Sequence, residues 1–311
     1  MAHHKLREDI KNFSLEDCAL GNQGYDRVLL QLFGYTGHGK SSFINSCKFV
    51  LDGEYRTIAE AGVTSHGGAM TMVRKAYKLT DAITMVDNRG CKDMNSFETL
   101  EVYSQLANFL PLNEEVKWKG DYDSLMERLE NADLSPNYTD FIVPIFVYSV
   151  RNKISSQDQI ELKNIIQACQ RITGVYPIVV LTYKTSRDYF EFEKKFRCFG
   201  AEVVFAVENY TETDHVETRG RHTDILNILK NAVDDVKFQM EKERNPVQER
   251  IDRRIFLLKM IRNADVEDRV SKRTKEAEKS RKPKESDVNN AQEHTEGKKK
   301  IHSKRNNCKT S

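Results

Sequence analysis

Residues 34 to 41 read Gly-Tyr-Thr-Gly-His-Gly-Lys-Ser, and this stretch decides which fold the chain can adopt. It matches the spacing GxxxxGK[ST], in which glycines let backbone N–H groups turn inward around phosphate oxygens. In this pattern the lysine, here Lys40, reaches the β- and γ-phosphates, and the hydroxyl of Ser41 holds Mg²⁺. The stretch therefore predicts a phosphate-binding loop, or P-loop, for a nucleoside triphosphate.

The flanking residues provide the context that a P-loop requires. An apolar run at 25–33 predicts a strand before it, and residues 40–50 predict a helix after it. The N-terminus of that helix carries partial positive charge and favours phosphate. A chance match in a glycine-rich turn is the alternative, and the strand and helix argue against it. We expect the nucleotide to contact Gly34, Thr36, Gly37, His38, Gly39, Lys40, Ser41 and Ser42.

An acidic residue at the end of a neighbouring strand is the second element that P-loop proteins use, because it organises Mg²⁺. Asp87 follows the run Ile-Thr-Met-Val and begins Asp-Asn-Arg-Gly, the DxxG form in which the N–H of Gly90 contacts the γ-phosphate. Four residues alone are weak evidence, and an ordinary turn at a strand end is the alternative. Its place downstream of the P-loop favours the functional interpretation.

A threonine between these two motifs is the third element, since it binds Mg²⁺ when a γ-phosphate is present. Residues 61–71 are small and glycine-rich, and they contain two candidates, Thr64 and Thr71. Thr71 is favoured slightly because it directly precedes a strand, although a threonine that simply starts a strand explains it nearly as well. The expected Mg²⁺ ligands are therefore Ser41, Asp87 and Thr71, with Thr64 as the alternative to Thr71.

Strands and helices alternate along the chain from residue 25 to about residue 240, which predicts an α/β fold with a mostly parallel sheet. Residues 72–79 and 82–86 predict a hairpin that adds one antiparallel edge. Further strands are expected at 141–150, 178–181 and 201–207. Further helices are expected at 97–109, 123–131, 157–172, 188–196 and 223–238.

The order of these elements resembles TRAFAC-type GTPases, and the details resemble the interferon-induced protein 44 family of P-loop GTPase-like proteins. The stretches that carry the resemblance are FGYTGHGKSSFINS (33–46), TMVDNRG (84–90), DFIVPIFVYSV (140–150), YPIVVLTYKT (176–185) and VFAVENYT (204–211). The resemblance covers roughly residues 25–240. It implies a Ras-like three-layer domain, GTP or GDP with Mg²⁺ as ligands, and an interferon or innate-defence setting.

The motif that reads the base departs from the GTPase pattern. GTPases usually carry [NT]KxD after this strand, and the acid reads guanine. Residues 182–185 read Thr-Tyr-Lys-Thr, so that Tyr183 replaces the lysine and Thr185 replaces the acid. An ATPase therefore remains an open alternative.

Three residues are candidates for the missing contacts to the base. A shift of one residue restores Lys184 as the lysine of the motif, although no acid follows in register. Asp188, the next acid in the sequence, lies three residues after Thr185. Asn209 follows the last strand, where such folds place a loop that contacts the base, although an asparagine there is more often a turn former.

The group that positions the attacking water is also missing. Small GTPases place a glutamine after DxxG, whereas Cys91 and Lys92 follow Gly90 here. His38 and Arg89 are weak candidates for a substitute, and a solvent-facing His38 without a catalytic role is the stronger interpretation. We expect slow hydrolysis that rises on self-assembly or with a partner. A pseudo-GTPase scaffold that binds nucleotide without turnover is the alternative.

The charge distribution suggests four segments: a lead-in at 1–24, the P-loop domain at 25–240, a charged helix at 241–268, and a disordered basic tail at 269–311. The tail holds fourteen Lys/Arg against six Asp/Glu, whereas the whole chain has a net charge of only +2. Apolar residues nearly vanish in the tail, so burial cannot offset its ordering entropy. The charged helix is the expected site for self-association or for a protein partner.

The last four residues, Cys308-Lys309-Thr310-Ser311, have the form of a prenylation box. A lipid with the upstream basic residues gives contact with an anionic membrane. However, the two residues after Cys308 are not aliphatic, and a merely solvated basic tail is the stronger interpretation. Nucleic acid is not expected as a partner, because the tail lacks interleaved aromatic residues. Without a signal-like or membrane-spanning run, we expect a cytoplasmic protein, peripheral on a membrane if Cys308 is prenylated.

Overall fold

The computed structural model describes residues 2–60, 72–92, 94–118, 120–132, 139–186 and 188–281. The chain divides into one large compact unit, Met1–Arg262, and a second unit, Asn263–Ser311. The large unit contains the P-loop and every strand described below. The described part of the second unit is helical.

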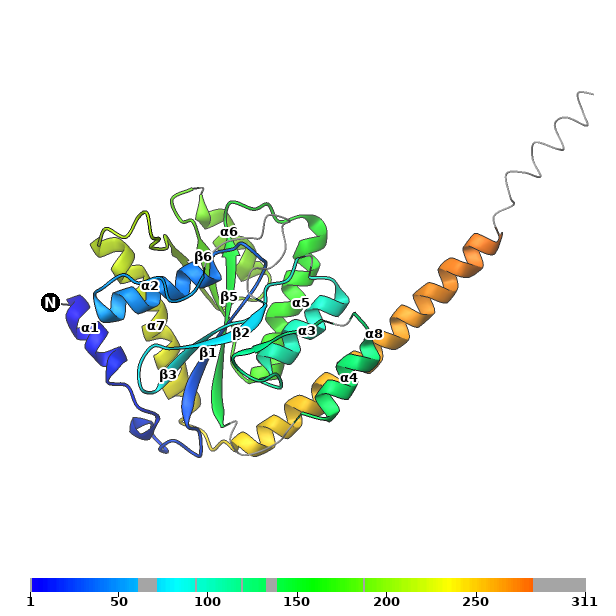
Figure 1. Cartoon of the computed structure of the whole chain (residues 1–311), viewed down its shortest axis with the longest axis horizontal. Helices are drawn as coiled ribbons and strands as arrows, with labels where there is room; N and C mark the ends of the chain where they lie inside the picture. The colour runs from blue at the N-terminus through cyan, green and yellow to red at the C-terminus, as the bar shows by residue number, and fades with distance from the viewer. Residues whose placement is uncertain are drawn as a thin grey trace, which may run out of the picture. The chain divides into compact units, whose positions relative to one another are not determined.

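A seven-stranded sheet, with strand order β4-β2-β3-β1-β5-β6-β7, forms the centre of the large unit (Figure 1). The five strands β3, β1, β5, β6 and β7 run parallel to one another. Strand β2 is antiparallel to β3 on one side and to β4 on the other. The predicted mostly parallel α/β sheet is confirmed. The strands are β1 (Arg27–Phe33), β2 (Val73–Lys78), β3 (Ile83–Asp87), β4 (Glu114–Glu115), β5 (Asp140–Ser149), β6 (Ile178–Thr182) and β7 (Val203–Val207).

Helices cover both faces of the sheet, and this arrangement buries the two sides of each central strand. Helices α1, α2 and α7 pack on one face, whereas α3, α5 and α6 lie on the other, with α4 against α3 (Figure 1). Their bounds are α1 (Ala2–Lys11), α2 (Lys40–Asp52), α3 (Ser96–Leu106), α4 (Tyr122–Glu130), α5 (Ser156–Thr173), α6 (Tyr189–Cys198) and α7 (Arg219–Gln239), with a 3₁₀ turn at Leu15–Asp17.

Strand β5 shows how the continuous apolar runs fit this arrangement. All ten of its residues are buried, as a strand between two helical layers requires. Pro144 lies in its middle, and proline cannot donate to a ladder. The residue is tolerated because β6 pairs with β5 only from Ile145 onward, so Pro144 needs no donor toward β6.

The predicted hairpin of β2 and β3 is confirmed, with Lys75 opposite Asp87. The short strand β4 was not predicted. It pairs antiparallel with β2 outside the hairpin. Two glutamates on a polar edge carry no periodic apolar signal, so this pairing has no signature in the sequence.

The expected boundary after residue 24 does not separate compact units. Residues 1–24 belong to the large unit, and Ile10, Phe13, Leu15 and Cys18 join the core under α7. The boundary expected at 240/241 does not separate units either, since the large unit continues to Arg262.

The charged helix is longer than predicted: α8 spans Pro246–Arg281. The expected disorder from residue 269 is therefore wrong as far as Arg281. Ion pairs one turn apart, Arg269 with Asp265 and Lys272 with Asp268, support this polar helix. Residues 282–311, including Cys308, lie outside the described residues.

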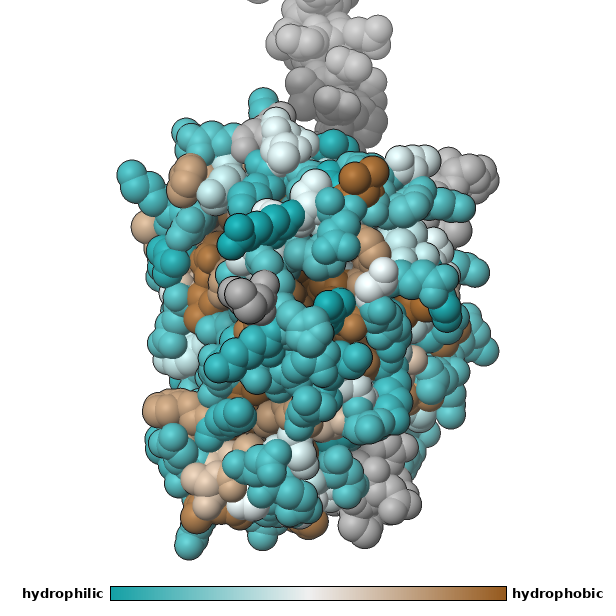
Figure 2. All heavy atoms as spheres, turned by 90° about the vertical axis from the view of Figure 1, so that its left-hand side faces the viewer, coloured by the Kyte–Doolittle hydropathy of each residue, from teal (hydrophilic) through white to brown (hydrophobic). Residues whose placement is uncertain are grey.

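The side of the large unit that carries α1 is mostly polar (Figure 2). In Figure 2, hydrophilic side chains cover most of the side on which α1 lies, and hydrophobic residues show only in separate groups between them. This is the surface expected of helices whose apolar stripes face the sheet. Among the described residues, no helix is both long enough and apolar enough to cross a membrane.

Arg74 of β2 is fully buried at the centre of a polar network beside the sheet. Its guanidinium donates to Oδ1 of Asn88, to Oε1 of Gln31 and to Oδ1 of Asn108, at 3.0, 2.9 and 2.8 Å. It also donates to the carbonyl oxygen of Leu110. A buried cation is tolerated when its donors are taken up by acceptors in this way.

We predict that Arg74→Met lowers the free energy of unfolding by about 3 kcal/mol, because several buried acceptors lose their donor at once. Urea denaturation of the full chain measures this change. Arg56→Met is the matched control, since Arg56 pairs with Glu54 on the surface and both side chains are exposed. Its midpoint should stay close to wild type. Equal midpoints for the two variants would contradict the role assigned to the network.

Candidate functional site: the P-loop and the strand ends around it

The P-loop turns sharply between β1 and α2. Gly34, Gly37 and Gly39 have φ angles of 137°, 77° and 90°, a region that side chains disfavour. Gly39 is the N-cap of α2, so the helix begins at Lys40. Among the hydrogen bonds of the described residues, none uses the N–H of Gly37, Gly39, Lys40 or Ser41. These donors sit at a helix N-terminus, which is a ready site for an anion.

Lys40 lies across the P-loop. Its ammonium donates to the carbonyl oxygens of Gly34 and Tyr35 at 3.3 and 3.0 Å. The side chain is almost fully buried, and burial lowers its pKa, although the nearby carboxylate of Asp87 opposes the shift. A cation held this close to the loop is well placed to meet a phosphate there.

Ser41, in the first turn of α2, and Asp87, at the end of β3, are in direct contact. The Ser41 hydroxyl donates to Oδ2 of Asp87 at 2.6 Å, and the Asp87 side chain is buried. A hydroxyl and a carboxylate are the hard oxygen ligands that Mg²⁺ prefers, and Mg²⁺ commonly takes its other ligands from phosphate and water. These two residues therefore fit the ion. Thr64 and Thr71, the other expected ligands, lie outside the described residues.

The segment after Asp87 lies directly on the P-loop. Thr36 donates its N–H to the Cys91 carbonyl at 2.9 Å, and Cys91 donates its N–H to the Gly34 carbonyl at 3.4 Å. A Cβ on Gly90 would come within 2.9 Å of the Lys40 ammonium and 3.2 Å of the Thr36 Cα. A side chain at position 90 would require Lys40 and Thr36 to shift, so the DxxG segment packs closely on the P-loop.

Two further strand ends reach the P-loop from the other side. The Thr182 hydroxyl at the end of β6 donates to the His38 carbonyl at 2.8 Å. The Asn209 amide after β7 donates to the Gly39 carbonyl at 3.1 Å. Asn209 therefore contacts the P-loop through the backbone carbonyl of Gly39, the N-cap residue of α2.

His38 is not solvent-facing, and that expectation is wrong. The side chain is 4% exposed. Its Nδ1 accepts the N–H of Ser149 at 3.1 Å, its Nε2 contacts the Asn152 amide, and its ring packs edge-on against Tyr148. Burial, with a smaller effect from Lys40, lowers the pKa of His38 to about 3. A neutral ring with both nitrogens engaged holds the P-loop to β5 and is poorly suited to activate water.

Arg89 is directed away from the P-loop. Its guanidinium donates to the Val116 carbonyl at 2.7 Å and stacks over the Trp118 ring at 4.2 Å. The thiol of Cys91 is buried, and burial raises its pKa to about 12. Neither residue is placed to position a water molecule, and slow hydrolysis stays a prediction.

Lys184 and Asp188 are engaged elsewhere in the fold. The Lys184 ammonium pairs with Asp224 of α7 at 2.7 Å. Oδ1 of Asp188 accepts the N–H of Phe190 and caps α6. Glu208, which the sequence analysis did not single out, instead binds Thr185 through its carboxylate. Strand register reveals this pair, whereas a linear motif does not.

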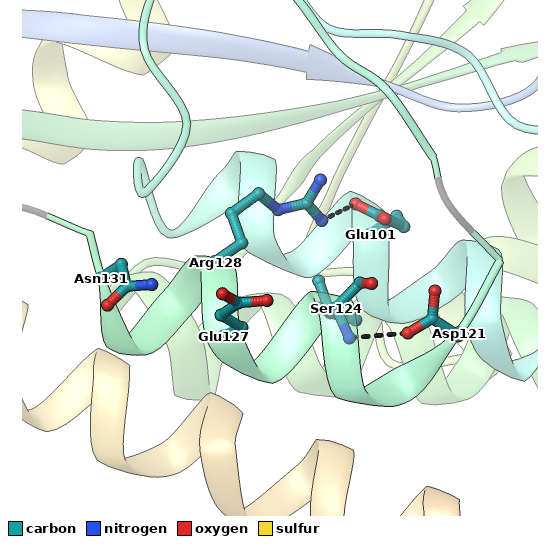
Figure 3. A pocket seen from close by; sticks show the side chains of 7 residues that line it. Glu101, Asp121, Ser124, Glu127, Arg128 and Asn131 are labelled. Atoms are coloured by element: carbon teal, nitrogen blue, oxygen red, sulfur yellow. Dashed lines mark hydrogen bonds and ion pairs between the residues drawn. The ribbon is translucent and has the colours of Figure 1, made fainter.

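A separate hollow of about 220 Å³ lies between α3 and α4 (Figure 3). Its polar groups serve the fold: Arg128 pairs with the buried Glu101, and Asp121 accepts the N–H of Ser124 as the N-cap of α4. Burial raises the pKa of Glu101 against the effect of Arg128. Packing explains this hollow, and it carries no P-loop residue.

No protein-family model matches the chain, and no curated protein matches it. Among solved structures, the chain is similar to the crystal structure of a probable GTP-binding protein engB, with 12% identity. The match covers 68% of this chain and 100% of that chain, with a TM-score of 0.32. A sequence identity and a TM-score this low do not assign a function to this chain. These comparisons do not show membership of the interferon-induced protein 44 family, which stays a prediction.

We predict that Gly90→Ala raises the dissociation constant for a Mg²⁺–nucleoside triphosphate about tenfold, since the new methyl group displaces the Lys40 ammonium. Titration calorimetry measures the constant. The control is Gly220→Ala in α7, where an added Cβ meets no atom within 4 Å. This control should raise the thermal midpoint slightly, because alanine favours a helix over glycine. Similar affinities for both variants would argue against the close packing of Gly90 on the P-loop.

His38 should make the protein less stable in mild acid. Its folded pKa of about 3 lies below the ordinary 6.5, so the unfolded chain gains a proton first and stability falls as pH drops below about 6.5. Between about pH 7 and pH 5 this costs about 2 kcal/mol. In His38→Gln that part of the loss should vanish, as measured by urea denaturation at both pH values. The exposed His4→Gln is the control, and an unchanged pH dependence in His38→Gln would refute the assignment.

Proposed function

We propose that this chain binds a guanine nucleoside triphosphate with Mg²⁺ and acts as a slow GTPase or a GTP-dependent switch. The observation that carries the proposal is the hydrogen bond between Ser41 and Asp87 at the foot of a P-loop with free N–H donors. Two motifs separated by more than forty residues meet as Mg²⁺ binding at a phosphate requires.

The contacts of Cys91 support a switch. Its backbone is hydrogen-bonded to both Gly34 and Thr36, and Gly90 covers the Lys40 ammonium. A phosphate that draws Lys40 and the Thr36 N–H toward itself must shift this segment. A nucleotide bound at the P-loop would therefore affect the residues after Asp87. The same segment is joined to α3, since the N–H of Lys92 donates to the Glu98 carboxylate at 2.9 Å.

Low turnover is part of the proposal. His38, Arg89 and Cys91 are each buried or engaged in the fold, so none of these three residues is free to position a water molecule. A scaffold that binds nucleotide without hydrolysis is the second candidate, and the same three residues favour it. An interferon or innate-defence setting is proposed only on the resemblance of motifs.

We expect calorimetry with GTP, GDP and ATP in the presence of Mg²⁺ to show binding of GTP and GDP that Lys40→Ala weakens at least about 100-fold, because a charge-assisted contact to phosphate is lost. Lys48→Ala is the matched control: it lies in the same helix, and its ammonium pairs with Asp52. Binding that survives in Lys40→Ala, or is absent from the wild type, would sink the proposed function.

A single-turnover assay separates the slow GTPase from the scaffold that binds nucleotide without hydrolysis. Release of phosphate from bound GTP at a slow but measurable rate supports the GTPase. No release over many hours supports the scaffold.

A further inference from the structure

The acid that reads guanine is missing from its usual place in the linear motif. Thr185 stands at that position. The nearby acids Asp188 and Asp224 are committed to the cap of α6 and to the Lys184 ion pair. The question is whether another carboxylate reaches the same point in space.

Glu208 does reach it. Its Oε2 accepts both the N–H and the hydroxyl of Thr185, at 2.9 and 2.6 Å. The carboxylate is therefore held against the residue that replaced the acid. No hydrogen bond among the described residues uses its other oxygen, Oε1, and the side chain is only half-buried. A carboxylate fixed by two donors on one side keeps acceptor capacity on the other.

The register of β6 and β7 explains this position. The two strands are parallel, and their last pair is Thr182 with Val207. Thr182 contacts the P-loop through His38, and Asn209 contacts it through Gly39. Glu208 lies between Val207 and Asn209, so its backbone is held next to the P-loop. The turn after β6 is docked on β7 as well, because the Lys184 N–H donates to the Val207 carbonyl.

We propose that Glu208, which follows β7, reads the guanine base in place of the acid that GTPases usually carry after the neighbouring strand; this rests on the proposed nucleotide-binding function. Guanine presents two adjacent donors, N1–H and the 2-amino group, and the remaining oxygen Oε1 has two lone pairs with which to accept them. Thr185 orients that carboxylate in advance, which reduces the entropy lost on binding.

The same carboxylate discriminates against adenine. The Watson–Crick edge of adenine carries an acceptor at N1, which faces a carboxylate oxygen without a proton between them. A polar site that leaves its groups unpaired rejects the wrong ligand strongly. Glu208 is therefore a specificity-determining residue, and it contacts the base without taking part in phosphate chemistry.

Glu208→Gln tests the proposal in the full chain, with GTP, ATP and xanthosine triphosphate as titrants. Xanthine carries an oxygen where guanine carries the 2-amino group. The amide of glutamine can donate to that oxygen, whereas the carboxylate cannot. We expect GTP affinity to fall about 10- to 100-fold, and affinity for xanthosine triphosphate to rise above that of wild type. The control is Glu212→Gln, an identical change on the exposed loop after β7.

The outcomes separate this inference from the proposed function. Wild-type GTP binding that is unchanged in Glu208→Gln overturns the assignment of Glu208 and leaves the proposed function intact. Equal losses for GTP and xanthosine triphosphate also overturn it, because they show that Glu208 only holds Thr185. A wild-type chain that binds none of the three nucleotides removes both. Thermal midpoints of the variant and its control confirm that each is folded.

Discussion

The backbone hydrogen bonds that join β1 to its two parallel neighbours place the carboxyl ends of the strands along one edge. Strand β1 pairs with β3 on one side and β5 on the other, in registers that set Leu32 beside both Asp87 and Ile145. The P-loop leaves β1 at this edge. Because β6 and β7 continue the parallel series, their ends reach the same loop. The position of the site therefore follows from the common direction of the parallel strands.

A buried polar network supports this edge from behind. Asn88, the residue after Asp87, is held by Arg74, and Arg74 also binds Asn108. The Asn108 carbonyl in turn accepts a bond from Arg250 of α8. Polar groups inside the protein fix conformation strongly when all their partners are present. The start of the DxxG segment is thus anchored, whereas Gly90 and Cys91, two and three residues after Asn88, contact the P-loop itself.

Much of the fold could be predicted from the sequence, because its signals are local. The apolar runs of β1, β5 and β6 and the periodic helices appear near their predicted positions. The turn at residues 34–41 and the strand end at Asp87 were recognisable because their residues match spacings that phosphate-binding loops require. What the sequence could not provide depends on distant contacts. The solvent-facing expectation for His38 failed because Ser149 and Tyr148, more than a hundred residues away, enclose the ring. Likewise, α8 extends past residue 269 because ion pairs along its own surface support a helix without a core.

The pairing of Thr185 with Glu208 is likewise a contact between distant residues that the sequence could not provide. A linear motif assumes that each role stays on its own segment, yet adjacent ends of parallel strands are interchangeable positions in space. Here the hydroxyl of Thr185 follows β6 and the carboxylate of Glu208 follows β7, and the two are hydrogen-bonded although the linear motif is absent. The phosphate side tolerates no such exchange, because the P-loop uses backbone N–H groups whose order along the chain is fixed. The altered base motif at residues 182–185 is therefore only weak evidence against guanine binding. The complete spacing of the P-loop remains the stronger evidence for binding of a nucleotide phosphate.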